Sequence, residues 1–158
     1  MYKTVVFDLD GTLLNTLTDL ADAGNRLCRK YGWPTHERQA YRYFVGNGIP
    51  KLVERLAPAD QRTPAVLEAA LADFKRDYGQ HLRDTTAPYP GIPEMLAKLK
   101  ANGVQLAVFS NKADALAKEV VKEYSGPQYF TIVRGQMTAV APKPAPEGPN
   151  ALLQAPPA

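Results

Sequence analysis

Hydrophobic residues form two kinds of run along this chain, and the alternation between them predicts its secondary structure. Short apolar runs at residues 5–7, 104–109 and 129–133 predict three strands. The first run is β-branched and aromatic with no polar face, which is typical of a strand buried on both sides of a parallel sheet. Between the runs, apolar residues recur at helical spacing. This pattern predicts an α/β fold.

The first helical pattern extends from Leu17 to Tyr31 and ends at Gly32. Thr16 and Asp19 have the spacing of a capping box, in which each side chain bonds the other residue's backbone N–H. We expect the apolar stripe of this helix, including Cys28, to be core. Cys28 is the only cysteine, so the chain has neither an internal disulfide nor a thiolate metal site.

Two further helical patterns cover residues 49–56 and residues 64–82, and no strand pattern interrupts residues 15–85. A helical stretch of this length between two strands predicts an inserted bundle. The expected organisation is therefore a Rossmann-like core formed by residues 1–14 and 88–158, with a helical domain of residues 15–87 inserted into it.

Composition narrows the class of protein without identifying it. The chain has 158 residues, of which 45% are hydrophobic and 22% charged, as in an ordinary globular protein. The net charge of +3 comes from scattered lysines and arginines, so nucleic acid is not an expected partner. The sequence shows neither a signal peptide nor a membrane-length apolar segment, so we expect a cytoplasmic protein with no membrane partner.

Two carboxylates end the first predicted strand. Asp8 and Asp10 should lie on one side of the extended chain with Leu9 on the other. Like charges this close are costly unless a cation lies between them or one is protonated. Gly11 then permits a sharp turn. Because open α/β sheets bind ligands at the carboxyl ends of their strands, this pair is a candidate functional site.

A second polar cluster, Ser110-Asn111-Lys112, follows the strand at residues 104–109 and precedes a helical pattern that starts at Ala113. A hydroxyl beside the amides of a helix N-terminus forms an anion site. A plain helix N-cap explains the same residues equally well, because Ser and Asn are favoured there.

Three features taken together, in chain order, resemble the motifs of the haloacid dehalogenase-like hydrolases. They are the strand and turn from Val5 to Leu13, Ser110 after the next core strand, and Lys143 in a Lys-Pro context. The resemblance implies a doubly wound parallel sheet with a helical cap, the cap being inserted just after the first motif. It also implies phosphoryl transfer, with Asp8 as the nucleophile and Asp10 as the general acid and base.

The same resemblance assigns the remaining site residues. Ser110 would hold the phosphoryl group together with Thr12 and Asn111, and Lys143 would neutralise its charge. Mg²⁺ would bind the carboxylate of Asp8 and the main-chain carbonyl of Asp10.

Within the family, the closest resemblance is to the phosphoglycolate phosphatases, which implies a small phosphorylated metabolite as substrate. The loop Gly46-Asn47-Gly48 in the predicted cap matches a glycine-bearing loop of those proteins that approaches the substrate.

The family's fourth motif, a strand ending in Gly-Asp that completes the magnesium site, has no counterpart in this sequence. We therefore expect a shortened sheet, incomplete at the C-terminus, with an open apolar edge at the first strand. A catalytically impaired, phosphate-binding or regulatory protein is one alternative. A sugar-phosphate mutase of the same family is another. A dehalogenase needs neither a metal nor the second carboxylate, so Asp10 argues against that activity.

Overall fold

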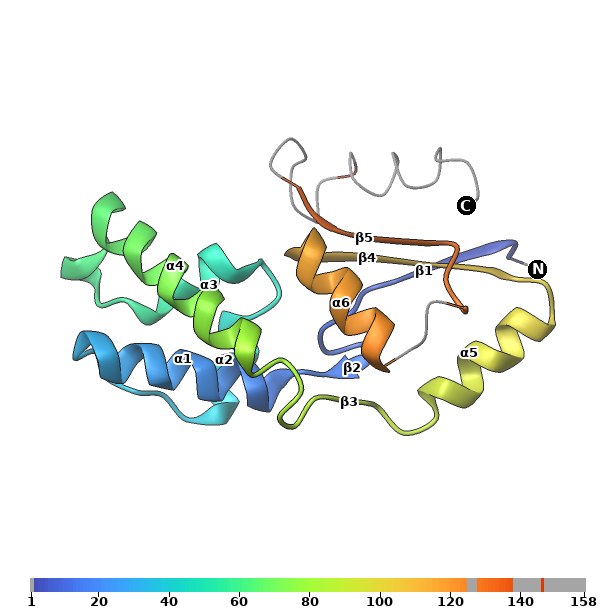
Figure 1. Cartoon of the computed structure of the whole chain (residues 1–158), viewed down its shortest axis with the longest axis horizontal. Coiled ribbons are helices and arrows are strands. Elements are labelled where there is room, and N and C mark those ends of the chain that lie inside the picture. Colours follow the sequence, from blue (N-terminus) through green and yellow to red (C-terminus); the bar gives the residue numbers. More distant parts are fainter. Residues whose placement is uncertain (1, 125–127, 138–145, 147–158) are drawn as a thin grey trace. The chain divides into compact units, whose positions relative to one another are not determined.

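The structure is a computed structural model that describes residues 2–124, 128–137 and 146. The chain divides into two compact units, one formed by Met1–Asn15 with Ala87–Ala158 and the other by Thr16–Thr86. The first unit contains a parallel sheet and the second is helical (Figure 1). The roles of these units as catalytic core and cap remain predictions.

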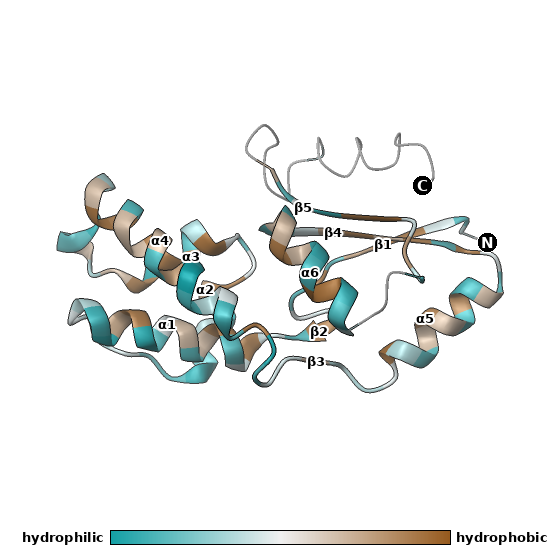
Figure 2. Ribbon diagram, in the orientation of Figure 1, coloured by the Kyte–Doolittle hydropathy of each residue, from teal (hydrophilic) through white to brown (hydrophobic). Residues whose placement is uncertain are grey.

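A parallel three-stranded sheet organises the first unit. Its order is β1-β4-β5, with β1 at Thr4–Phe7, β4 at Gln105–Ala113 and β5 at Ile132–Gln136. Among the described residues of this unit, the helices are α5 (Ile92–Ala101) and α6 (Asp114–Tyr124), and α6 packs against β4 and β5 (Figure 1). The predicted α/β class with a parallel sheet is confirmed. Apolar residues form the middle of β4 (residues 106–109) and the start of β5 (Ile132 and Val133), and the hydrophobic colour in Figure 2 follows this part of the sheet.

Three strand predictions require correction. Strand β1 is not buried on both sides, because Val6 is 37% exposed and its neighbours are only half-buried. In the described residues β1 pairs with β4 alone, so its other edge has no strand partner there. Strand β5 lies three residues later than predicted at both ends, and β4 extends to Ala113 instead of ending at residue 109.

The second unit follows its predicted helices closely. It contains α1 (Leu17–Tyr31), α3 (Ile49–Leu56) and α4 (Pro64–Gln80), with Gly32 in the left-handed C-cap conformation. The periodicity did not reveal the one-turn α2 (Tyr41–Phe44) or the 3₁₀ turns at Arg38–Ala40 and Ala59–Gln61. The core of this unit includes Cys28, Tyr41, Leu52, Phe74 and Tyr78, all almost completely buried. In the described part of the chain, every helix is too short or too polar to cross a bilayer.

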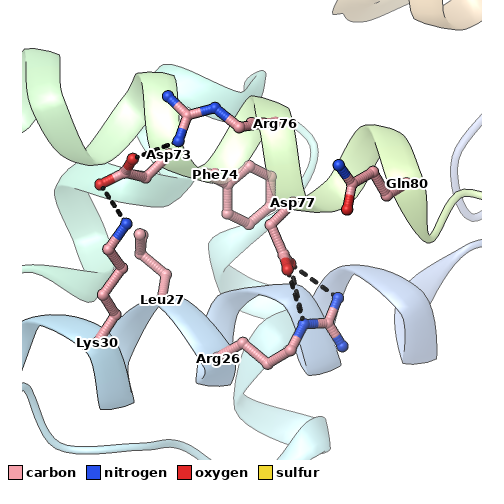
Figure 3. A pocket seen from close by; sticks show the side chains of 8 residues that line it. All are labelled: Arg26, Leu27, Lys30, Asp73, Phe74, Arg76, Asp77 and Gln80. Atoms are coloured by element: carbon pink, nitrogen blue, oxygen red, sulfur yellow. Dashed lines mark hydrogen bonds and ion pairs between the residues drawn. The ribbon is translucent and has the colours of Figure 1, made fainter.

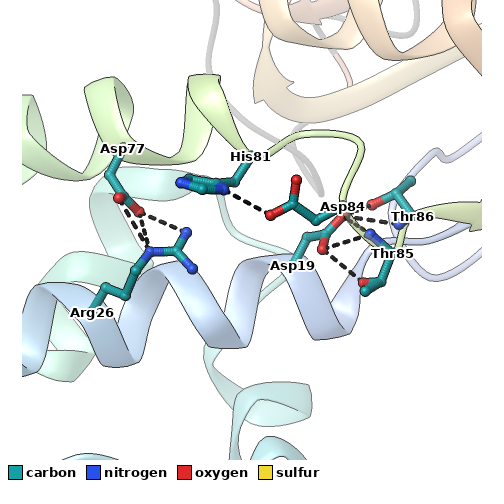
Figure 4. A network of polar contacts seen from close by, with 7 residues as sticks. All are labelled: Asp19, Arg26, Asp77, His81, Asp84, Thr85 and Thr86. Atoms are coloured by element: carbon teal, nitrogen blue, oxygen red, sulfur yellow. Dashed lines mark hydrogen bonds and ion pairs between the residues drawn. The ribbon is translucent and has the colours of Figure 1, made fainter.

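The predicted capping box at the start of α1 is wrong. The side chain of Thr16 makes no capping hydrogen bond, and Asp19 bonds a distant segment instead. Its carboxylate accepts hydrogen bonds from the backbone N–H and the hydroxyl groups of Thr85 and Thr86, at 2.7–3.0 Å (Figure 4). The carboxylate therefore joins the two ends of the helical unit.

Just outside that unit, the two chain segments that lead into and out of it pair with each other. Strand β2 (Leu14–Asn15) is antiparallel to β3 (Ala87–Pro88), with Leu14 opposite Pro88. The Tyr89 N–H donates to the carbonyl of Leu13 at 3.2 Å and extends the pairing. The two segments thus form a short antiparallel ribbon.

Candidate active site

The turn after β1 presents two carboxylates, as the sequence predicts. Leu9 is fully buried, whereas Asp8 is exposed and Asp10 half-buried, so the side chains alternate. Gly11 has φ +79°, which lets the chain reverse sharply there. The Leu9 carbonyl accepts from the Leu13 N–H at 3.0 Å and holds the turn closed.

Three consecutive polar residues lie buried near the end of β4. Ser110, Asn111 and Lys112 are 2%, 7% and 4% exposed, respectively. They belong to the strand, and α6 begins only at Asp114, so both expectations that placed a helix N-terminus at Ser110, the anion site and the simple N-cap, are wrong. The pairing register with β5 shifts between Phe109 and Ala113, which is the irregularity that bulges introduce near functional sites.

The parallel register brings the two clusters together. Phe7 pairs with Val108, so the residues that follow each strand emerge at the same edge of the sheet. There the ammonium of Lys112 donates to both carboxylate oxygens of Asp10, at 3.2 and 3.3 Å. The Lys112 side chain is 2% exposed and that of Asp10 17%. An opposite charge thus lies beside the Asp8–Asp10 pair.

Sequence reasoning did not assign a role to Lys112. A lysine in a polar tripeptide is typical of a solvated position. The only available signal was its place at the end of a strand parallel to the one that bears Asp10.

Lys112 also contacts Ser110 through its main chain. Its backbone N–H donates to Ser110 Oγ at 3.1 Å. Because a serine hydroxyl accepts and donates at once, this contact occupies an acceptor site and keeps the hydroxyl proton as a donor. A phosphoryl oxygen requires such a donor.

The other predicted site residues are distributed as follows. Thr12 is exposed in the turn after Gly11. Lys143 lies outside the described residues. Gly46, Asn47 and Gly48 form a loop in the helical unit between α2 and α3, and both glycines have positive φ, +107° and +89°.

Arg55 supports that loop from α3. Its guanidinium donates to the carbonyl of Phe44 at 3.0 Å, the carbonyl of Tyr43 at 3.3 Å and Asn47 Oδ1 at 3.1 Å. Sequence reasoning did not single out this arginine.

The donor set near β1 suits a hard divalent cation in part. The Asp8 carboxylate and the Asp10 carbonyl are the oxygen ligands that Mg²⁺ prefers, and Mg²⁺ often takes its remaining ligands from water and substrate phosphate. Among the described residues, no group of three or more acidic, histidine or cysteine side chains forms a complete cage. The residues present therefore fit a magnesium ion that the substrate helps to bind.

A pocket in the helical unit is a weaker candidate. It has a volume of about 200 Å³ and lies between α1 and α4 (Figure 3). Its charged lining residues pair with one another: Arg26 with Asp77 at 2.8 Å, and both Lys30 and Arg76 with Asp73 at 3.2 Å. These contacts explain the charges as packing between helices.

Cys28 is excluded as a nucleophile by its surroundings. It is fully buried in α1, and burial raises the pKa of its thiol. A buried thiol with a raised pKa carries little thiolate, which is the reactive form.

Comparison with known proteins agrees with the geometry. Residues 5–156 match the family model described as haloacid dehalogenase-like hydrolase. The phosphoglycolate phosphatase of Thiobacillus denitrificans is 33% identical over 147 residues, which cover 91% of this chain and 65% of that protein. The corresponding enzyme of Neisseria meningitidis is 35% identical over 147 residues, which cover 91% of this chain and 63% of that protein. The chain thus spans just under two thirds of the length of these relatives.

The fold comparison points the same way. The crystal structure of a predicted phosphoglycolate phosphatase from Haemophilus somnus has a TM-score of 0.85 and 28% identity to this chain, covering 96% of it and 70% of that protein. The order of motifs, the parallel sheet and the match over nearly the whole sequence all agree. This chain belongs to the haloacid dehalogenase-like hydrolase family.

Proposed function

We propose that this chain is a magnesium-dependent phosphomonoester hydrolase that acts through an aspartyl-phosphate intermediate, with a substrate such as phosphoglycolate. The observation that carries the proposal is the cluster at the ends of β1 and β4. It combines an exposed carboxylate at Asp8, a second carboxylate at Asp10 held by Lys112, and a buried hydroxyl at Ser110. The relatives named above supply the substrate class.

In the proposed reaction, a carboxylate oxygen of Asp8 attacks phosphorus as the bond to the ester oxygen breaks. The departing oxygen takes a proton from Asp10, and the alcohol leaves. Asp10 then removes a proton from water as that water attacks the phosphoaspartate, which releases phosphate and restores Asp8. Mg²⁺, when bound by Asp8 and the Asp10 carbonyl, would supply positive charge for the transferring oxygens.

The remaining residues hold the phosphoryl group in this proposal. Ser110 donates its hydroxyl proton to a phosphoryl oxygen, and Asn111 and Thr12 contribute further polar contacts. Lys143 supplies positive charge. The loop Gly46-Asn47-Gly48, held in shape by Arg55, contributes to substrate selection.

The test measures hydrolysis of phosphoglycolate by the purified chain, with and without Mg²⁺, for the wild type and Asp8→Asn. We expect Asp8→Asn to lower kcat by more than about 1,000-fold. Acid-quenched wild-type protein should carry one phosphoryl group on the peptide that contains Asp8. Asp60→Asn, at an exposed position in the helical unit, is the matched control and should retain full activity. Turnover by Asp8→Asn at the wild-type rate would contradict the proposal.

A second candidate is a phosphate-binding protein without turnover. The observation that favours it is the incomplete acidic cluster in the described residues. This alternative predicts saturable binding of inorganic phosphate by calorimetry, abolished by Ser110→Ala, together with no release of phosphate from any monoester. Magnesium-dependent turnover that Asp8→Asn abolishes would eliminate it.

A further inference from the structure

We propose that Lys112 is the positioning residue of this site: its side chain fixes the carboxylate of Asp10 for proton transfer. The inference rests on the proposed function and extends it to a residue that neither the motifs nor the comparisons assign.

Burial is the first argument. Transferring an ammonium out of water costs several kcal/mol, so lysines are almost never fully buried without a charged partner. The Lys112 side chain is only 2% exposed, and its ammonium contacts Asp10. Lys30, Lys51 and Lys118 also pair with carboxylates, but at the surface, where their side chains are 50–59% exposed. The Lys112–Asp10 pair therefore differs in kind from them.

The geometry of the ion pair supplies the second argument. The Lys112 ammonium lies 3.2 Å from one carboxylate oxygen of Asp10 and 3.3 Å from the other. A nearly symmetric contact restrains rotation of the carboxylate plane. Each oxygen has two acceptor sites, so a contact with Lys112 leaves the group able to exchange a proton elsewhere. Misplacing a proton donor by about 1 Å costs about 100-fold in rate, so this restraint affects catalysis directly.

The backbone of Lys112 is itself held firmly. A Cβ atom on Gly135 of β5 would collide with the Lys112 carbonyl oxygen and would lie 2.6 Å from Asp114 Cα. The Gly135 N–H donates to Asp114 Oδ1 at 2.9 Å. Strand β5 therefore packs directly against the segment that carries Lys112, so the ion pair with Asp10 starts from a fixed backbone.

The test compares two substrates that differ in their need for a proton donor. An alkyl ester such as phosphoglycolate requires protonation of its leaving oxygen, whereas p-nitrophenolate departs without it. We expect Lys112→Met to lower kcat for phosphoglycolate by about 100-fold and for p-nitrophenyl phosphate by less than about fivefold. KM for each ester should change by less than about threefold. Lys118→Met, which removes the exposed partner of Asp114, is the matched control and should change neither rate.

Equal losses on both esters would show that Lys112 acts only through the stability of the site and would overturn the inference. In an Asp10→Asn background, Lys112→Met should lower kcat further by less than about twofold, because the residue acts through Asp10. A further loss of about 100-fold in kcat in that background would also overturn the inference.

Failure of the proposed function has a different signature, since the wild type would then hydrolyse neither ester. In that case, urea unfolding of Lys112→Met, Asp10→Asn and the double variant decides whether Lys112 holds Asp10. Coupling of about fivefold or more in the unfolding equilibrium constant supports the positioning role. Additive effects would refute it.

Discussion

The two units each contain a buried or half-buried aspartate with strong partners, and the partners differ. Asp19 in the helical unit accepts hydrogen bonds from uncharged N–H and hydroxyl donors of Thr85 and Thr86 (Figure 4). Asp10 in the sheet unit faces the ammonium of Lys112. Both carboxylates contact partners far away in the sequence, at separations of 66–67 residues for Asp19 and 102 residues for Asp10.

This difference separates a structural carboxylate from one that is suited to chemistry. Oriented dipoles surround Asp19 and fill its acceptor sites, so it holds two segments together and offers little to a ligand. The ammonium of Lys112 lies against the charge of Asp10, and the Asp10 side chain stays 17% exposed after β1. We infer that removing Asp10 should impair activity, whereas removing Asp19 should impair stability.

Between these two aspartates, the larger expected effect is that of Asp10→Asn on turnover. Loss of the proton donor should lower kcat for phosphoglycolate by about 1,000-fold, within the range for general acid catalysis. Steady-state phosphate release measures it. Fluorescence of Trp33, the only tryptophan, reports on the helical unit in which it is buried, and its emission in the folded variant should match that of the wild type. An unchanged kcat would remove Asp10 from the mechanism.

Asp19→Asn should have the opposite profile. The amide replaces one acceptor oxygen with a donor group that faces the donors of Thr85 and Thr86, at a cost of about 2–4 kcal/mol in the free energy of unfolding. Urea unfolding followed by Trp33 fluorescence measures this cost. The folded fraction should retain its kcat at low temperature. Asp22→Asn, at an exposed position on the same helix, is the control and should stay within about 0.5 kcal/mol of the wild type.

Gly135→Ala tests the sheet unit in a way that leaves the chemistry of every side chain in place. The added methyl group would collide with the backbone of β4 and α6, so we expect a loss of about 1–3 kcal/mol in thermal unfolding followed by circular dichroism. Gly79→Ala is the control, since it lies in α4 with nothing near its Cβ position and should stabilise the chain by about 0.5–1 kcal/mol. Equal stability of the two variants would show that the close approach is not needed.

The smallest expected effect is the pH dependence that Asp19 contributes. Burial raises the pKa of Asp19, but the hydrogen bonds from the side chains and backbone of Thr85 and Thr86 outweigh it and hold the pKa below its ordinary value. A carboxyl group with a lower pKa in the folded state stabilises it above the ordinary pKa of an aspartate. That contribution is lost as the pH falls through the folded pKa.

The free energy of unfolding, measured by urea and Trp33 fluorescence between pH 7 and pH 3, should therefore fall at the acid end of this range. Asp19→Asn should show a shallower decline, because it lacks the titrating group. Parallel pH profiles for the two proteins would mean that other carboxyl groups, such as Asp114, whose pKa is also lowered, account for the acid sensitivity.

Local patterns predicted the regular elements well where burial is one-sided or complete. Apolar spacing located α1, α3 and α4 within a few residues, because each buries one stripe against its neighbours. It misplaced β5 and missed the single turn of α2, since short segments contain too few residues for a period to emerge.

The same distinction between local and long-range contacts explains which site residues could be predicted from the sequence. Asp8, Asp10 and Ser110 are recognisable from the sequence because each follows an apolar run, and the ends of parallel strands meet at one edge of a sheet. The capping box at Thr16 was wrong because spacing shows which partners are near in the chain, whereas Asp19 found stronger donors 66 residues away.

The sequence by itself determined the α/β class, the inserted helical segment and the carboxylates at the end of the first strand. All of these follow from properties of neighbouring residues: periodicity, turn-forming glycines and motif order. Only the tertiary structure decided that Lys112 meets Asp10 and that Asp19 joins both ends of the helical unit. Those contacts depend on strand register and on helix packing across long separations in the chain, and no local pattern encodes the distance between two such side chains.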